Sequence, residues 1–433
     1  MRIGESEEAR LTAHRLRAVV LGEVHARPFT PIASPKRVLH FAFETTPEQG
    51  EADRRGLAQF CAERGLTAPE PGGKHHRVAL GATALRWEQH SEFTTYTWEL
   101  PSEAAAAGPF HPSAPALAQP MGLVTQPGPL LVAIDLHLVN DMGVAMERLF
   151  DPASLTAAET GDGAALFATD FQPDPAGFVR IAIIDRSLNA ARAGALVQRV
   201  IEIETYRTLA LLGLPEAQRL APTVRQIETR LAEVTAEMRR TEGFTANHRL
   251  LDELTALAAE VEAAATASLF RFGASRAYEE IVHLRLQTIG ERPVAGLTTW
   301  SAFLARRMAP AMRTCTTLEQ RLANLSTKLA RAADLLRTRV DVELQQQNRD
   351  LLSSMNRRTQ LQLRLQATVE GLSVAAISYY VVGLFGYLAK GVSESGVPFD
   401  VSLATAAFVP IAVGSIWWVV RRIRRRHVDA GAD

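Results

Sequence analysis

The tract Gly22–Phe29, with the sequence GEVHARPF, is the first run of side chains that could do chemistry in this 433-residue chain. Glu23, His25 and Arg27 alternate along it, so an extended chain would place a carboxylate, an imidazole and a guanidinium on one face. Pro28 favours that extended conformation at Arg27. Such a face could bind an ion or an anionic group. The alternative is a local polar network that only fixes the path of the chain.

A second polar pair lies in the tract IDLHLVND, where Asp135 and His137 share one face of a predicted strand. An Asp-x-His pair can ligate a metal ion, but in strands such pairs are more often hydrogen-bonded core or surface groups. We therefore treat both residues as ligand-binding candidates and predict no metal site. The run His75–Arg77, beside Gly72 and Gly73, is predicted to be a solvated loop.

Signatures of the common catalytic classes are missing from the sequence. It contains no G-x-x-x-x-G-K-[ST], H-E-x-x-H, C-x-x-C or G-x-S-x-G pattern. Cys61 and Cys315 do not have the spacing of a zinc site or a disulfide framework. The formal net charge of zero argues against a nucleic-acid-binding protein. We predict no catalytic residue and no enzymatic activity, and the sequence identifies no cofactor.

Two segments near the C-terminus carry no charged residue. They are residues 371–389 (GLSVAAISYYVVGLFGYLA) and 401–420 (VSLATAAFVPIAVGSIWWVV). As helices, each would be about 28–30 Å long, which matches the hydrocarbon core of a bilayer. The short intervening loop is rich in turn formers. We predict a transmembrane hairpin, with a buried hairpin of a soluble domain as the alternative.

Arginines flank the predicted hairpin on both outer sides, whereas the loop between the spans contains only Lys390. The positive-inside rule then places both termini in the cytoplasm and the loop outside, in a bacterial inner membrane. The N-terminal sequence MRIGESEEAR is polar and lacks the apolar core of a signal peptide. The flanking arginines are Arg349, Arg357, Arg358 and Arg364 before the first span, and Arg421, Arg422, Arg424, Arg425 and Arg426 after the second.

The spans contain no acidic residue and no histidine that could relay protons. An ion path would have to use hydroxyls, small residues or backbone carbonyls, and the same small residues could instead pack helices together. The candidates for either role are Ser373, Ser378, Gly383, Gly386 and Tyr387.

The first part of the chain mixes strand and helix patterns, which predicts an α+β domain over residues 1–188. A helix is expected at 47–65, where proline and glycine mark its two ends. The tract 101–120 is rich in Pro and Ala and is predicted to be a loop. The predicted strands are 37–44, 76–89, 92–100, 128–139, 165–171 and 177–185.

After residue 188 the pattern becomes helical, with helices predicted over 191–213, 215–243, 247–272 and 275–289. We expect a helical domain at 189–296, a long stalk helix at 297–366 and the hairpin at 367–433. Pro310 should kink the helix that starts at Thr298. Leu318 to Leu336 follow a 4–3–4 spacing, but Leu344 and Leu351 leave that register. This drift favours packing against other helices over a long two-stranded coiled coil.

Three tracts resemble a bacterial family of membrane-anchored proteins known only as a domain of unknown function. They are LGEVHARPF, LLSSMNRRTQLQLRLQ and RLQATVEGLSVAAISYYVVGLFGYLAKG, and the resemblance covers nearly the whole chain. The layout also resembles CorA-type magnesium transporters, in which a Gly-Met-Asn motif ends the first span. Here Gly386-Tyr387-Leu388 stands in that place, so the resemblance does not imply the family's ion selectivity.

Three functions are compatible with these features. The favoured hypothesis is a non-enzymatic inner-membrane protein whose cytoplasmic part forms a homo-oligomeric platform or sensor, with the bilayer as a partner and no nucleic acid. The second is a CorA-like divalent-cation channel that lacks the usual motif. The third is an enzyme that uses Glu23, His25 and Arg27, or Asp135 and His137.

Overall fold

The computed structural model describes residues 14–17, 20–21, 29–102, 109–110, 120–141, 145–394 and 400–429, with residues 424–429 described by their backbone alone. Glu23, His25 and Arg27 lie outside these residues. The chain forms two compact units, one built from Met1–Ala236 and Glu253–Ala332, the other from Glu237–Asp252 and Ala333–Asp433.

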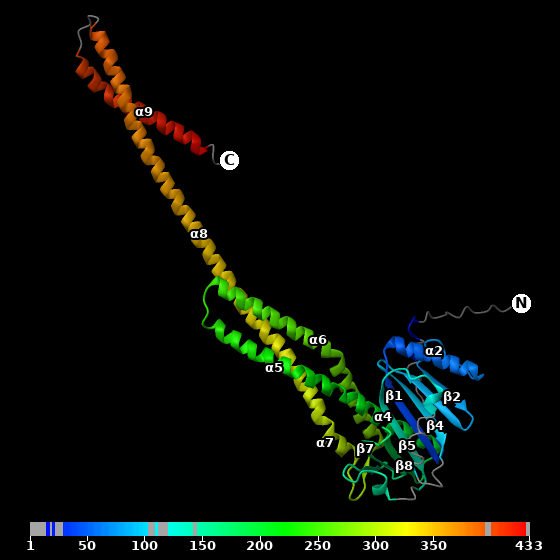
Figure 1. The fold of residues 1–433 in the computed structure, drawn as a ribbon. Helices are drawn as coiled ribbons and strands as arrows, with labels where there is room; N and C mark the ends of the chain where they lie inside the picture. Colours follow the sequence, from blue (N-terminus) through cyan, green and yellow to red (C-terminus); the bar gives the residue numbers. More distant parts are fainter. Residues whose placement is uncertain are drawn as a thin grey trace, which may run out of the picture. The chain divides into compact units, whose positions relative to one another are not determined.

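The first unit is organised around a mixed sheet in the order β2-β3-β4-β1-β5-β8-β7-β6-β9 (Figure 1). β5 and β8 pair in parallel, whereas the other pairs are antiparallel. The sequence prediction of an α+β domain followed by long helices is confirmed. The strands are β1 (Lys36–Glu44), β2 (His75–Leu80), β3 (Thr83–Gln89), β4 (Phe93–Pro101), β5 (Leu130–Val139), β6 (Thr156–Glu159), β7 (Ala165–Pro173), β8 (Val179–Asp185) and β9 (Arg292–Pro293).

Helices cover both faces of this sheet. On one face, α4 (Ala190–Leu211) packs with the end of α6 (Phe244–Ile289) and with α7 (Trp300–Arg307) over Ile134, Leu136 and Leu138 of β5. On the other face, α2 (Pro47–Glu63) packs against Trp87, Tyr96 and Trp98. The alternation of side chains along each strand supplies both cores, because successive residues point to opposite faces.

Short local signals start these helices. Thr46 and Gln49 form a capping box at α2, where Pro47 occupies the first helical position. The Asn189 side chain accepts a hydrogen bond from Arg192 N at 2.9 Å and so caps α4. Each cap satisfies a backbone N–H that would otherwise lack a partner.

The sheet differs from its prediction in four places. The run His75–Arg77 was predicted to be a loop, and this is wrong, because these residues begin β2. The tract 76–89 was predicted to be one strand, and this is wrong: β2 and β3 form a hairpin that turns at Gly81, where φ is +65°. Val78 of β2 pairs with Leu85 of β3, so the apolar alternation shifts by one residue across the turn. The short strands β6 and β9 were not predicted, because four residues and two residues are too few to show a period.

One helix is longer than predicted. α6 is one continuous helix, so the predicted division into 247–272 and 275–289 is wrong; Gly273 lies inside it with open space around its Cα. α5 (Gly213–Met238), α6 and the first turns of α8 (Ala309–Glu394) pack together, with Arg321 Nη2 2.7 Å from Glu228 Oε2 and Ser326 Oγ 2.6 Å from Glu262 Oε1. Leu318, Leu322, Leu325 and Leu329 form the buried stripe of α8.

The expected kink at Pro310 is instead a break at Met308, between α7 and α8. Pro310 lies in the first turn of α8, where a missing backbone N–H removes no helical hydrogen bond. Met308 and Met312 are buried in the core under the sheet, so the break is packed on both sides.

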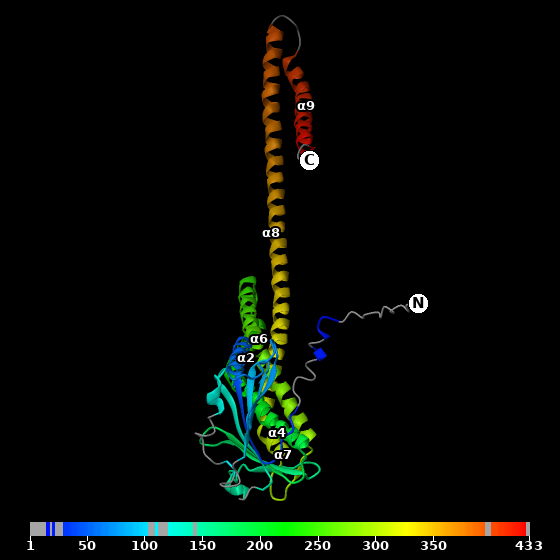
Figure 2. The same cartoon turned by 90° about the vertical axis from the view of Figure 1, so that its right-hand side faces the viewer.

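In the second unit, α8 continues to Glu394 and α9 (Val401–Asp429) turns back beside its last turns (Figure 2). Phe385 stacks on Phe408 at 4.0 Å between ring centroids, and Ala389 and Ala412 are buried. Small residues at such contacts let two helices approach closely. Glu343 of α8 accepts a hydrogen bond from Asn247 Nδ2 at 2.8 Å, which joins the start of α6 to α8 within this unit.

Gly194 of α4 is predicted to tolerate no side chain. Its added Cβ would lie 1.8 Å from the backbone oxygen of Thr30, where the segment ending at the buried Ile32 crosses the helix. Gly194→Ala should therefore destabilise the chain by about 1–3 kcal/mol in urea unfolding followed by tryptophan fluorescence. Gly273→Ala, in open space on α6, is the control and should be neutral or stabilising. Equal behaviour of the two variants would contradict the close crossing.

Candidate functional site

Asp135 and His137 lie on the central strand β5 and are both 1% exposed. Arg37, from the neighbouring strand β1, donates from Nε to Asp135 Oδ1 and from Nη2 to Oδ2, at 3.0 Å each. The register pairs Arg37 with His137 across the two strands, so all three residues share one sheet face. This bidentate ion pair neutralises the buried carboxylate.

His137 is held in one orientation by its neighbours. The backbone N–H of Phe110 donates to His137 Nε2 at 3.3 Å, and the two rings meet edge to face with their centroids 4.8 Å apart. Because Nε2 accepts this hydrogen bond, the ring proton lies on Nδ1. Nδ1 is buried and makes no hydrogen bond to a described residue. The 3.4 Å contact between Nε2 and Asp135 Oδ1 is therefore not an ion pair.

A second pair of oppositely charged side chains lies next to Asp135. Arg180 of β8 lies beside Asp135 in the parallel register, and its Nη2 is 3.7 Å from Asp170 Oδ2. Two arginines thus balance two aspartates. Within the described ranges, no group of three His, Cys, Asp or Glu side chains could hold a metal ion. The arrangement favours a structural role, because its charges are already paired and it leaves no free carboxylate for a ligand.

The end of the tract GEVHARPF can be followed only from Phe29, which is 51% exposed. The next residues lie on α4, where Ile32 N donates to Ala190 O at 2.9 Å. The described part therefore shows a chain segment packed on a helix. Ligand binding by Glu23, His25 and Arg27 stays a prediction, since these three residues fall outside the described ranges.

The residues proposed as pore or packing candidates in the spans differ in how closely other residues surround them. Ser378 is 4% exposed, and a Cβ on Gly386 would contact the Thr405 side chain of α9. Gly383 has open space around it, Ser373 is exposed, and Tyr387 is 79% exposed. Gly386 thus lies at the contact between α8 and α9, whereas Gly383 and Tyr387 do not.

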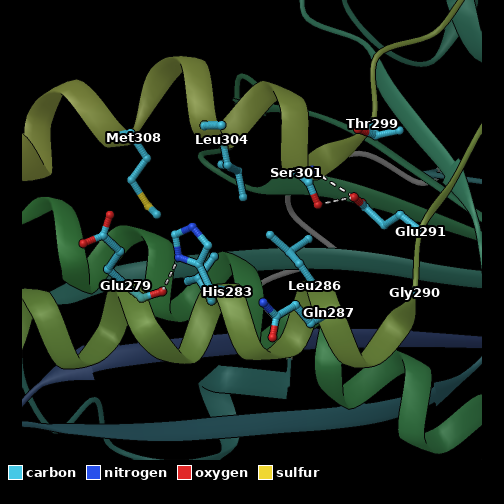
Figure 3. A pocket seen from close by; sticks show the side chains of 13 residues that line it. Glu279, His283, Leu286, Gln287, Gly290, Glu291, Thr299, Ser301, Leu304 and Met308 are labelled. Carbon is cyan, nitrogen blue, oxygen red and sulfur yellow. Dashed lines mark hydrogen bonds between the residues drawn. The ribbon is translucent and has the colours of Figure 1, made fainter.

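A groove of about 600 Å³ lies between α6 and α7 and was not predicted from the sequence. Its floor is formed by the buried side chains of Val282, Leu286, Leu304 and Met308. Figure 3 shows Leu304 and Met308 pointing toward Leu286 and His283 of the facing helix. The volume is in the range of small-molecule pockets. Its residues come from two helices and one turn and form no motif; only the break at Gly290, Pro293 and Gly296 signals it.

Polar groups lie along the rim of this groove. His283 donates from Nδ1 to the backbone oxygen of Glu279 at 3.0 Å, which leaves Nε2 as the acceptor. At the other end, Glu291 Oε2 accepts from Ser301 N at 3.0 Å and also from Ser301 Oγ, at the start of α7 (Figure 3). Burial raises the pKa of Glu291. Its Oε1 is buried and makes no hydrogen bond to a described residue, so the ionised form of this carboxyl group is destabilised.

Replacing one member of the Arg37–Asp135 pair should destabilise the fold more than replacing both. Arg37→Leu and Asp135→Leu each leave one buried charge unpaired and should each lower the free energy of unfolding by about 3–5 kcal/mol. The double variant should lose much less than the sum of the two, because no unpaired charge remains. Urea unfolding of the four chains measures this; additive losses would show that the two side chains do not form a coupled pair.

Comparison with known proteins identifies a family but no characterised relative. The family model described as "Protein of unknown function (DUF3422)" matches residues 12–427. No curated protein and no solved structure matches the chain. These comparisons give the CorA-type layout no support, while they confirm the resemblance carried by LGEVHARPF and by the first span. Because the match spans nearly the entire sequence, the chain belongs to this family of unknown function.

Proposed function

We propose that this chain is a non-enzymatic protein of the bacterial inner membrane. In this proposal a C-terminal hairpin anchors it, both termini are cytoplasmic, and the sheet-containing part acts as an oligomeric platform or sensor. The single observation that carries the proposal is a pair of long apolar helices whose side chains are almost entirely exposed.

The exposure of these helices argues against a soluble core. Only 11% and 6% of the apolar windows in α8 and α9 are buried inside the molecule. Leu372, Leu384 and Leu403 are 73%, 68% and 73% exposed. Soluble monomers rarely expose apolar surface over such lengths, because each buried methylene is worth about 0.8 kcal/mol. A bilayer supplies the apolar environment that the described residues lack.

The end of α9 supports the proposed orientation. Arg421 lies over the Trp417 ring at 4.7 Å, and Arg422 lies over the Trp418 ring at 5.1 Å. Tryptophan and arginine together are typical of the boundary between a bilayer and water. The positive-inside rule assigns this boundary to the cytoplasmic side.

The middle of α8 supports self-association. Every residue from 344 to 369 is exposed, including Leu351, Leu361 and Leu365. Helices in proteins are stabilised mainly by packing of an apolar face, which this segment does not obtain from its own chain. Other copies anchored in the same membrane would run parallel to it and could cover these side chains.

The other two hypotheses have less support. Gly386 is the first residue of the tripeptide that stands in place of the CorA motif, and a Cβ there would contact Thr405 of α9, so it has the position of a packing residue. Asp135 and His137 lie in a charge-balanced network at 1% exposure, which leaves a substrate no access to them. We therefore propose neither ion transport nor catalysis.

Deleting residues 367–433 should convert the chain from a membrane protein into a soluble one. The intact chain should stay with membranes after alkaline carbonate washing, whereas the shortened chain should appear in the supernatant. A matched control, Leu384→Ala/Leu403→Ala, keeps both spans long and should remain in the membrane fraction. Retention of the shortened chain by washed membranes would contradict the anchor.

The intact chain in a maltoside detergent should be an oligomer by light scattering after size-exclusion chromatography. Replacing Leu351, Leu361 and Leu365 by glutamine should shift it toward the monomer, because the substituted side chains no longer favour burial between copies. Gln346, Gln360 and Gln366 changed to glutamate, on the same helix, control for general changes in the segment. A monomer of the unmodified chain would contradict the proposal.

A further inference from the structure

A second cavity, of about 470 Å³, lies between α2, β4 and residues 123–127. Its size is that of a small-molecule site. Hydrogen-bonding side chains form much of its wall: Gln49, Gln59, Thr125 and Gln126. Phe60 and Leu57 contribute apolar surface from α2. All of these residues belong to the first unit.

A carboxylate is fixed at this cavity by two buried rings. Asp53 Oδ1 accepts from Tyr96 Oη at 2.6 Å, and Oδ2 accepts from Trp87 Nε1 at 2.7 Å. Trp87 and Tyr96 face each other across β3 and β4 and are 0% and 1% exposed. The sheet therefore sets the position of both donors, and Asp53 is held in one orientation before any ligand arrives.

Among the residues that the structure describes, no basic side chain forms an ion pair with Asp53. Its two hydrogen-bond donors are neutral, and burial raises the pKa of Asp53. Of the described residues that line the cavity, Arg64 is the one with a basic side chain. Its guanidinium contacts other groups. It lies 4.0 Å above the Phe60 ring, donates to Phe60 O at 3.2 Å and is 3.6 Å from the carboxylate of Glu63. The cavity thus keeps one net negative charge, at Asp53.

We propose that this cavity binds a small organic cation, an amine that also carries hydrogen-bonding groups. Its ammonium would donate to Asp53, in a charge-assisted hydrogen bond inside a partly dehydrated site. The amides and the hydroxyl of the wall would pair with the rest of the molecule. A metal ion fits less well, because the other carboxylate in the lining, Glu63, is beside Arg64 and no three-residue ligand group occurs in the described part of the chain.

This site contrasts with the Arg37–Asp135 pair on the same face of the sheet. Asp135 is matched by a guanidinium with two hydrogen bonds and is closed to solvent. Asp53 is half-buried, opens to a cavity and has no cation. An amine would give the sensor of the proposed function its ligand, so in that respect the inference rests on that proposal.

Binding can be measured with the full chain in a maltoside detergent by isothermal titration, using three molecules of one length. They are 4-aminobutanol, 1,4-butanediol and 4-hydroxybutanoate, which differ in charge. The amine should bind at least about tenfold more tightly than the diol, as expected for a hydrogen bond between charged groups. The anion should bind no better than the diol.

Three variants locate the site. Asp53→Asn should weaken amine binding at least about tenfold and leave the diol unchanged. Gly56→Phe should block all binding while keeping the fold, because Gly56 is exposed on α2 with open space around it. Glu48→Gln removes an equal charge from α2 outside the cavity and should change nothing.

Equal affinity for amine and diol, or full amine binding by Gly56→Phe, would overturn the proposal. No amine binding by the unmodified chain up to about 10 mM would overturn it as well. These outcomes are independent of the membrane-fractionation result, so failure of the cation site and failure of the anchor are distinguishable.

Discussion

The fold depends on one constraint: α8 must remain helical while its side chains pass through three different environments. From Cys315 to Leu329 it buries a single leucine stripe against α5 and α6. From residue 344 to 369 it buries nothing, and from 371 to 389 it is apolar on every side. A helix satisfies its own backbone hydrogen bonds in core, water and lipid alike. The side chains alone therefore decide which environment each stretch requires.

In the sheet, the comparable constraint is that buried charged side chains lie beside side chains of opposite charge. Arg37 with Asp135, and Arg180 with Asp170, place opposite charges together where water is excluded. A buried charge without a partner is unfavourable, so complete pairing indicates structure and incomplete pairing indicates a function or a missing ligand. By this criterion Asp135, which the sequence singled out, belongs to the architecture. Asp53, by contrast, is a half-buried carboxylate whose two hydrogen-bond donors, Trp87 and Tyr96, are both neutral.

The sequence predicted the parts of the molecule that depend on local patterns. The two apolar segments, the positions of most main strands along the chain and the shared face of Asp135 and His137 all follow from periods of two or from unbroken hydrophobicity. It could not supply Arg37 as the partner of Asp135, because only strand pairing brings together residues 98 positions apart. Asp53 lies in a charged helical run and appears solvated until Trp87 and Tyr96 are placed beneath it.

The groove between α6 and α7 was missed because its residues come from two helices and the turn between them and form no sequence motif. Its far wall ends at Met308, and α8 begins at the next residue. Met308 and Met312 are both buried in the core that α4 and the sheet form, so the start of α8 cannot move without repacking that core. Any occupant that separates α6 from α7 would therefore act directly on the helix that carries the first apolar segment.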